Sequence, residues 1–157
     1  MKLGFIGTGK IASSVIIGIC NSKIKFKQII VSPRNKKTAN FLKKNFRKVN
    51  IAKNNQEVIN KSSWIFLSVT PKVGEKVIKN LRFNTNQTIV SFISTINLSN
   101  LKKMIKVKTE IVRAIPLPPI SLKKGPVPIY PPNKKVKSFF DKIGSTIEIK
   151  NEKLSIN

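Results

Sequence analysis

Hydrophobic residues in this chain occur in short continuous runs that alternate with segments in which they recur every three or four positions. Residues 1–21, MKLGFIGTGKIASSVIIGICN, show both patterns: an apolar run, a break at Gly7-Thr8-Gly9, and then apolar residues at helical spacing. Short continuous runs are typical of buried strands, whereas the wider spacing predicts a helix. Residues 1–21 therefore predict a strand, a tight turn and a helix.

The same alternation continues along the chain. Further strands are expected at residues 28–32, 49–52, 64–69, 88–93, 110–115, 127–130 and 146–149, and helical segments at 35–46, 56–60, 73–81, 98–105 and 136–143. Strands regularly separated by helices predict an α/β fold, here a Rossmann-like, doubly wound, mainly parallel sheet in a single domain at residues 1–150. Prolines crowd residues 116–132 and remove ladder donors, so the run at 127–130 is expected at a sheet edge or lining a cleft.

The turn after the first strand has the spacing of a dinucleotide-binding motif, G-x-G-x-x-A, with Ala12 in the third small position. Gly7 allows a sharp turn out of the strand, and Gly9 leaves the backbone open to a pyrophosphate. The N–H groups in the first turn of the next helix face an anion at such a place. Because the motif directly follows a predicted strand, it predicts a dinucleotide site; the alternative is an ordinary glycine-rich turn.

The end of the second predicted strand, Ser32-Pro33-Arg34-Asn35, favours NADP(H) over NAD(H). NAD enzymes place an acidic residue here for the ribose hydroxyls, and this chain has no Asp or Glu before Glu57. A guanidinium can bind a 2′-phosphate through two hydrogen bonds. The alternative is that Arg34 and the lysines after it form a solvated loop.

Two further strand ends offer hydroxyl groups and accessible backbone. Residues Val69-Thr70-Pro71 and Ser94-Thr95 follow the fourth and fifth predicted strands, at the sheet edge where doubly wound folds bind ligands. They are candidates for the nicotinamide ribose, although structural turns have a similar composition. Asn55 follows the third strand and is a candidate for the adenosine half, in a chain where asparagine is common.

The charge and the apolar runs of the chain limit the partners that it can have. With 31 Lys and Arg against 6 Asp and Glu, the formal net charge is +25, which attracts polyanions at low salt. The basic residues are spread through every segment, so we expect no specific nucleic-acid partner, and a basic nucleic-acid binder is kept as a weaker alternative. No apolar run approaches the roughly 20 residues that a membrane span needs, so we expect no membrane association and a cytoplasmic location.

The composition excludes several kinds of catalytic site. The chain has no His, its six acidic residues are scattered, and Cys20 is its single cysteine, so no catalytic triad, paired carboxylates or metal site can be assembled. The reaction must therefore be carried by a cofactor, and hydride transfer fits. No proton donor or catalytic residue can be assigned.

The chain as a whole resembles the N-terminal domain of the pyrroline-5-carboxylate reductase family. The segments that carry the resemblance are MKLGFIGTGKIASSVIIGI, VSPRN, WIFLSVTPKV, IVSFISTINL, IVRAIPLPPISLKKGPVPIYPP and FFDKIGSTIEIKNEKL. The resemblance implies an NAD(P)H-dependent imine reductase of proline biosynthesis that is a dimer or larger.

The resemblance also implies roles for single residues. The pyrophosphate would be held by Gly7, Thr8, Gly9, Lys10 and Ile11, the adenosine phosphate by Ser32, Arg34 and Asn35, the adenine-side ribose by Asn55, and the nicotinamide half by Val69, Thr70, Pro71, Ser94 and Thr95. On the substrate side it implies Pro116, Leu117 and Pro118.

Three departures from the family pattern stand out. Lys10 replaces a usual Asn, and Thr70 replaces a usual Lys beside the nicotinamide. The family's Met-Pro-Asn-x-Pro is here Ile115-Pro116-Leu117-Pro118-Pro119, so Leu117 replaces an amide. Residues 151–157 are expected to be the start of a truncated or absent helical C-terminal domain, which in the family carries the dimer interface and most substrate contacts.

From these observations we expect NADPH-dependent hydride transfer to the C=N of a cyclic imine, with a homo-oligomer if a C-terminal domain is supplied. The alternative is a non-catalytic NADP-binding module or a partner-binding protein.

Overall fold

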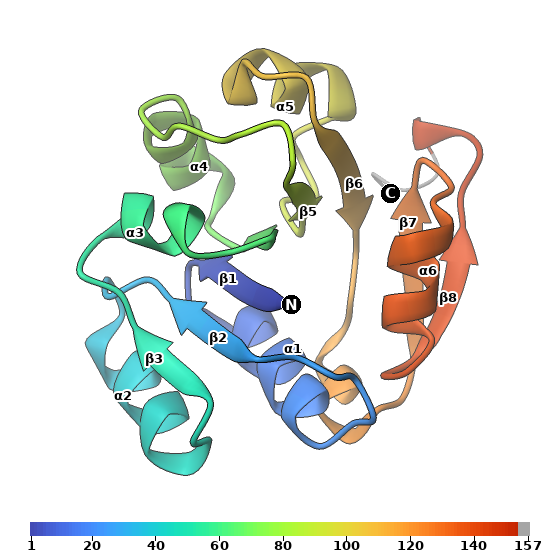
Figure 1. The fold of residues 1–157 in the computed structure, drawn as a ribbon. Coiled ribbons are helices and arrows are strands. Elements are labelled where there is room, and N and C mark those ends of the chain that lie inside the picture. Colours follow the sequence, from blue (N-terminus) through green and yellow to red (C-terminus); the bar gives the residue numbers. More distant parts are fainter. Residues whose placement is uncertain (154–157) are drawn as a thin grey trace.

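The computed structural model describes residues 1–153 of the chain, and within them a single sheet carries helices on both faces (Figure 1). The strands are β1 (Lys2–Ile6), β2 (Gln28–Val31), β3 (Val49–Ile51), β4 (Trp64–Leu67), β5 (Thr88–Ser91), β6 (Glu110–Ala114), β7 (Pro126–Tyr130) and β8 (Ser145–Glu148). The helices are α1 (Lys10–Cys20), α2 (Lys36–Asn45), α3 (Asn55–Asn60), α4 (Pro71–Ile78), α5 (Leu98–Ile105) and α6 (Lys134–Phe140), with a 3-10 helix, η1 (Pro118–Leu122).

The order of the strands creates a switch point beside β1. The sheet runs β3-β2-β1-β4-β5-β6-β7-β8, so the chain leaves β1 toward β2 and β3 and then returns to β4 on the other side of β1. All neighbouring pairs from β3 to β6 are parallel, and β7 is antiparallel to β6. This topology confirms the predicted Rossmann-like, doubly wound sheet, in which ligands bind where the strand order reverses.

Two separate hydrophobic clusters fill the faces of the sheet, because successive strand residues point to opposite sides. Phe5 and Phe66, both fully buried, stack with their ring centroids 4.5 Å apart on the face covered by α1, α2, η1 and α6. Ile6 and Leu67 lie on the other face, with residues of α3, α4 and α5. Figure 1 shows α1 and α2 on the opposite side of the sheet from α3, α4 and α5. No helix within residues 1–153 is both long and apolar enough to cross a membrane.

The prediction of an edge strand at 127–130 is wrong, because β7 pairs with β6 on one side and with β8 on the other. The N–H and C=O groups of one strand residue point toward the same neighbour. The Pro128 carbonyl accepts from the Ile115 N–H at 3.0 Å, so Pro128 and Pro126 turn their missing donors toward β6. The pairing of β7 with β6 is short, so few donors are needed on that side. Ile129 faces β8 instead, and its carbonyl accepts a hydrogen bond of 2.8 Å from the Ile149 N–H. The sheet therefore tolerates prolines in an internal strand.

Candidate functional site

A pocket of about 620 Å³ lies at the switch point, where the carboxyl ends of β1, β2 and β4 meet. Each of these strands contributes the residues that directly follow it. The lining residues are Gly7, Thr8, Gly9, Arg34, Asn35, Lys36, Ser68, Val69, Thr70 and Val73. The structure therefore brings together three strand ends that the sequence singled out independently.

Gly7 is required by the turn itself. Its φ of +99° lies in the region that L side chains rarely adopt, and a Cβ there would lie 2.5 Å from the Ser68 carbonyl oxygen. The Gly7 N–H donates to Ser32 Oγ at 2.8 Å, which ties the turn after β1 to the end of β2. The turn is thus fixed by backbone geometry and by one buried hydroxyl.

Gly9 differs from Gly7, because nothing in the protein requires a glycine at this position. Its φ is −71°, which any residue adopts, and a Cβ on Gly9 would meet no atom within 4 Å. Gly9 is exposed at the pocket surface. The space that its missing side chain leaves is the space that a phosphate group needs to approach the backbone.

Three helices begin at this pocket, and two of them, α1 and α4, lack side-chain caps. In α2, α3, α5 and α6 an asparagine side chain accepts a hydrogen bond from the first turn; the capping residues are Asn35, Asn54, Asn97 and Asn133. Helix α1, capped by Gly9, and helix α4, capped by Thr70, have no such bond. The N–H groups at the start of α1 are therefore available to an anion in the pocket.

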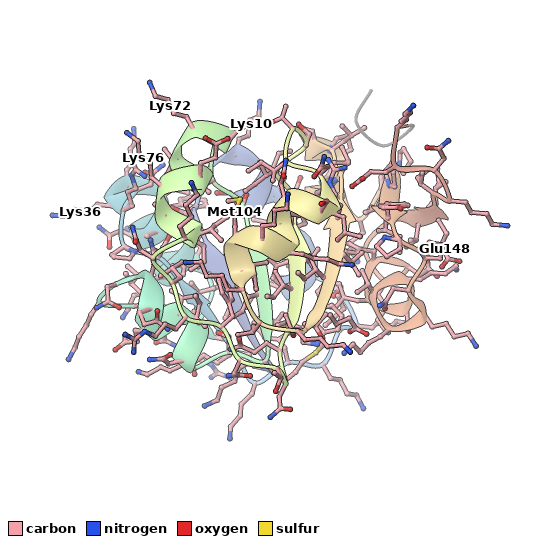
Figure 2. All side chains as sticks on the ribbon, turned by 90° about the horizontal axis from the view of Figure 1, so that it is seen from above. Lys10, Lys36, Lys72, Lys76, Met104 and Glu148 are labelled. Atoms are coloured by element: carbon pink, nitrogen blue, oxygen red, sulfur yellow. The ribbon has the colours of Figure 1, made fainter. Side chains whose placement is uncertain are left out.

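Lysines stand at these helix starts where acidic residues are usually favoured. Lys10 and Lys36 are the first residues of α1 and α2, Lys72 is the second of α4, and the first turns of these helices hold no acidic residue. Figure 2 shows Lys10, Lys36, Lys72 and Lys76 on the same side of the molecule. A cation near the positive end of a helix dipole is unfavourable by itself. A bound polyanion would offset both the dipoles and the lysines.

One buried polar atom at the pocket has no partner in the described part of the chain. Thr8 is 2% exposed and lines the pocket, and its Oγ1 makes no hydrogen bond. Such a group costs roughly 1–3 kcal/mol unless a partner arrives. Thr8 therefore fits a ligand that brings an acceptor to the turn.

The structure separates the predicted site residues into two sets. Lys10 and Ile11 form the first turn of α1, next to the pocket, and Pro71 begins α4. Ser32 is 1% exposed and lies beneath the turn, so a direct contact with a phosphate stays a prediction. These four residues adjoin the pocket without lining it, and the predicted residues that lie farther from it are Asn55, Ser94, Thr95, Pro116, Leu117 and Pro118.

Those outer residues occupy distinct places. Asn55 begins α3 with its Oδ1 buried and unpaired among residues 1–153, and Ser94 and Thr95 are exposed after β5. Leu117, 47% exposed, precedes η1, which packs against α1. Their roles on the ribose, the nicotinamide and the substrate stay predictions.

Sequence reasoning missed Ser68 and Val73 in the pocket lining. Ser68 precedes the predicted strand end, and Val73 is the third residue of α4, at positions where their types alone indicate only packing. No acidic residue lines the pocket, and residues 1–153 hold no group of three or more His, Cys, Asp or Glu side chains that could bind a metal. The described site can therefore bind a phosphate-rich anion.

Comparisons with known proteins agree with this geometry. Residues 2–97 match the family described as NADP oxidoreductase, coenzyme F420-dependent. The Danio rerio protein named pyrroline-5-carboxylate reductase 3 is 32% identical over 129 residues, which are 80% of this chain and 44% of that protein.

Two solved structures share the fold. The 1-pyrroline-5-carboxylate reductase from Streptococcus pyogenes aligns with a TM-score of 0.82 at 24% identity, over 98% of this chain and 59% of that one. The Plasmodium falciparum pyrroline carboxylate reductase, solved with NADP bound, aligns with a TM-score of 0.81 at 23% identity over the same shares. The chain spans about half the length of the relatives it matches. It belongs to the NADP oxidoreductase, coenzyme F420-dependent family, and it corresponds to the N-terminal, NADP-binding domain of the pyrroline-5-carboxylate reductases.

Proposed function

We propose that this chain binds NADPH in the switch-point pocket and forms the cofactor-binding part of an imine reductase of the pyrroline-5-carboxylate reductase type. The observation that carries the proposal is the start of α1: its N–H groups are uncapped, and a Cβ on Gly9 would meet no protein atom. A backbone built in this way fits a pyrophosphate. The names of the relatives supply the reaction class, reduction of a pyrroline carboxylate.

The charged residues of the pocket support NADPH over NADH. Arg34 and Lys36 line the pocket after β2, where an NAD enzyme needs a carboxylate for the ribose hydroxyls. No acidic residue lies there to repel a 2′-phosphate. Arg34 would bind that phosphate through two N–H groups, with Lys36 as a second cation.

The residues of this chain would orient the cofactor. The first turn of α1 would hold the pyrophosphate, and the backbone at Val69 and Thr70 would support the nicotinamide half. NADPH, when bound, supplies a hydride for the carbon of a C=N bond, and the imine nitrogen takes its proton from water. Holding the dinucleotide extended across the switch point lowers the entropy cost of bringing the two reacting carbons together.

Titration of the chain with NADPH, NADH and ATP at about 0.15 M salt tests the cofactor half of the proposal. We expect NADPH to bind about tenfold or more tightly than NADH, because a desolvated arginine–phosphate pair contributes on the order of 1.5–3 kcal/mol. Arg34→Gln should remove most of this preference and leave NADH binding unchanged. Arg47→Gln, which removes an exposed arginine outside the pocket lining, is the charge-matched control.

Three outcomes contradict the proposal: absent binding, equal binding of NADPH and NADH, or ATP binding as tight as NADPH. The last would show attraction of any polyanion to a chain of net charge +25.

A non-catalytic NADP-binding module is the second candidate. It is favoured by the lining of the described pocket, which holds no acidic residue to move a proton. Assay of 1-pyrroline-5-carboxylate reduction by the chain, alone and mixed with the C-terminal half of a relative, separates the two functions. Turnover supports the reductase, and NADPH binding without turnover in both cases supports the module.

A further inference from the structure

Arg113 is the largest fully buried side chain of the described residues, and it is not part of the pocket lining. It lies on β6, and none of its side chain is exposed. Burying a guanidinium costs several kcal/mol unless the charge is paired and hydrogen-bonded. Its Nη1 forms an ion pair with Glu152 Oε2 at 3.1 Å, and its Nη2 donates to the Ser94 carbonyl oxygen. The buried charge is thus paired with a carboxylate and a main-chain carbonyl.

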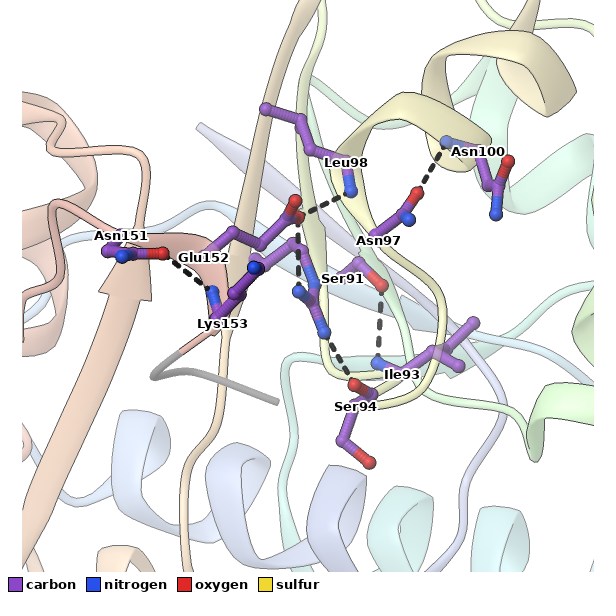
Figure 3. Close-up of polar contacts among 10 residues, drawn as sticks. Ser91, Ile93, Ser94, Asn97, Leu98, Asn100, Asn151, Glu152 and Lys153 are labelled. Atoms are coloured by element: carbon purple, nitrogen blue, oxygen red, sulfur yellow. Dashed lines mark hydrogen bonds and ion pairs between the residues drawn. The ribbon is translucent and has the colours of Figure 1, made fainter. Parts of the chain in front are cut away.

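Ser94 and Glu152, which both contact Arg113, belong to segments far apart in the sequence. Ser94 lies in the connection from β5 to α5, and Glu152 follows β8. Glu152 Oε2 also accepts a hydrogen bond of 2.6 Å from the N–H of Leu98, the first residue of α5 (Figure 3). One carboxylate oxygen therefore joins the buried arginine to the start of a helix.

The connection from β5 to α5 is consequently held at two points. Arg113 holds the carbonyl of Ser94, and Glu152 holds the N–H of Leu98. Asn97 caps the same helix by accepting from the Asn100 N–H at 2.9 Å. The exposed residues Ser94 and Thr95 thus lie on a segment whose backbone is held by a charge pair beneath it.

The position of residues 94–98 in the sheet indicates a role for the ion pair of Arg113 and Glu152. Strand β5 is the neighbour of β4, whose end lines the pocket, and both strands point toward the same edge of the sheet. Ser94 and Thr95 follow β5 at this edge, where the sequence makes them candidates for the nicotinamide ribose. Arg113 itself does not line the pocket, so it acts on the nicotinamide half through the segment whose Ser94 carbonyl it holds.

We propose that Arg113 and Glu152 are positioning residues that fix the backbone of residues 94–98 against the nicotinamide half of a bound dinucleotide. This inference rests on the proposed function. It also makes the segment after β8 part of the cofactor site, because Glu152 supplies the carboxylate that pairs with Arg113. Coupling of this kind is reciprocal, so a bound nicotinamide should in turn stabilise the position of Glu152.

A purely structural ion pair makes a different prediction. If Arg113 and Glu152 only stabilise the fold, their loss lowers the melting temperature and affects all ligands of the pocket alike. A positioning pair affects ligands that reach residues 94–98 and spares ligands that do not. Adenosine 2′,5′-bisphosphate lacks the nicotinamide half and therefore separates the two cases.

The test compares Glu152→Gln with Glu110→Gln, the matched control. Glu110 begins β6 and pairs with Lys135 at 2.9 Å, away from the pocket. We expect Glu152→Gln to weaken NADPH binding about tenfold, since a misplaced contact segment costs one or two orders of magnitude. Binding of adenosine 2′,5′-bisphosphate should stay unchanged, and Glu110→Gln should affect neither ligand. Equal weakening of both ligands by Glu152→Gln, or of neither, would overturn the proposal.

Amide hydrogen exchange without ligand is a second readout. Glu152→Gln should speed exchange of the Leu98 amide, which the carboxylate binds, and should leave the Asn100 amide protected by Asn97. Unchanged protection of Leu98 overturns the proposal independently of the cofactor. If the wild-type chain binds neither ligand, the proposed function fails together with the role at the nicotinamide, whereas the exchange result still decides whether the pair fixes the segment.

Discussion

Ser32 Oγ accepts a hydrogen bond of 2.8 Å from the N–H of Gly7, which joins the end of β2 to the turn after β1. Ser32 is 1% exposed, and the Gly7 N–H has no other hydrogen-bond partner within residues 1–153. Ser32→Ala leaves that N–H unpaired in a partly buried place, so we expect a loss of about 1–3 kcal/mol of folding free energy. We also expect weaker NADPH binding, because the turn that faces the pyrophosphate loses its support.

Ser13→Ala is the control for this change. Ser13 lies on α1 with a buried Oγ that has no hydrogen-bond partner among the described residues. The same loss of a hydroxyl should therefore be neutral or stabilising there. Urea unfolding of both variants measures the difference, and a Ser32→Ala variant as stable as Ser13→Ala would show that the bond to Gly7 contributes little.

Gly9→Ala should separate binding from folding. A Cβ at this position meets no protein atom, and the backbone conformation is ordinary, so we expect a nearly unchanged melting temperature. The new methyl group occupies the approach of the pyrophosphate, so NADPH affinity should fall about tenfold or more. Gly7→Ala should instead destabilise the fold by more than about 1–2 kcal/mol, because it combines a φ of +99° with a 2.5 Å contact to the Ser68 carbonyl. Tight NADPH binding by Gly9→Ala would contradict the assignment of the turn.

The sequence predicts most of the fold because its patterns are local. A β-branched run at 28–32 becomes Gln28–Val31, and the apolar run at 64–69 becomes Trp64–Leu67. These strands are buried on both faces, and so their composition alone marks them. The internal position of β7 in the sheet is not predictable in this way, because it depends on which neighbouring strand each proline faces. A tertiary pairing of that kind leaves no trace in the local pattern.

The candidate site likewise contains residues that the local sequence predicts and contacts that it does not. Gly7, Gly9 and Arg34 are predicted because the turn motif and the strand ends are contiguous in sequence, and all three line the pocket. The bond from Gly7 to Ser32 and the pairing of Arg113 with Glu152 join residues 25 and 39 positions apart. An arginine inside an apolar strand carries no local sign that its charge will be neutralised from beyond β8. Those contacts become visible only when the topology is known.

Gly18→Ala should destabilise the packing of α1 against η1. A Cβ on Gly18 would lie 2.4 Å from the Ile120 carbonyl oxygen, which belongs to backbone and cannot move alone. We expect a loss of about 1–3 kcal/mol from overpacking, although alanine is the better helix former by about 1 kcal/mol. Gly74→Ala on α4 is the control, because its nearest neighbour is the flexible tip of Ile93 at 3.1 Å. Equal unfolding free energies for the two variants would contradict the close approach of η1.

The thiol of Cys20 should be unreactive in the folded protein. Burial raises the pKa of Cys20 to about 11, with the charge of Lys48 opposing the shift. At pH 8 the thiolate fraction is then on the order of 100-fold below that of an unfolded cysteine. We expect slow alkylation by iodoacetamide in buffer and rapid alkylation in urea. Because the folded pKa is raised, the protonated thiol favours folding below about pH 8.5, and this contribution is lost as the pH rises toward the folded value. Alkylation at equal rates in both solvents would show an accessible thiol.

The pair of Glu110 and Lys135 should give the protein an acid-sensitive contribution to stability. The hydrogen bond from Lys135 is the main cause that holds the pKa of Glu110 below its ordinary value, and burial opposes it. A lowered folded pKa means that the contribution is complete above about pH 5 and is lost as the pH falls through the folded pKa.

Both side chains are about half exposed, so the pair should contribute no more than about 1 kcal/mol. Glu110→Gln should therefore lower the melting temperature slightly at neutral pH and converge with the wild type in acid. Lys135→Met gives the second arm of a double-mutant cycle, which should show coupling near neutral pH and none once Glu110 is protonated. Coupling that persists unchanged in acid would contradict the charge pair, whereas packing of Lys135 over the Trp64 ring, 5.6 Å away, would appear only as a pH-independent effect of Lys135→Met alone.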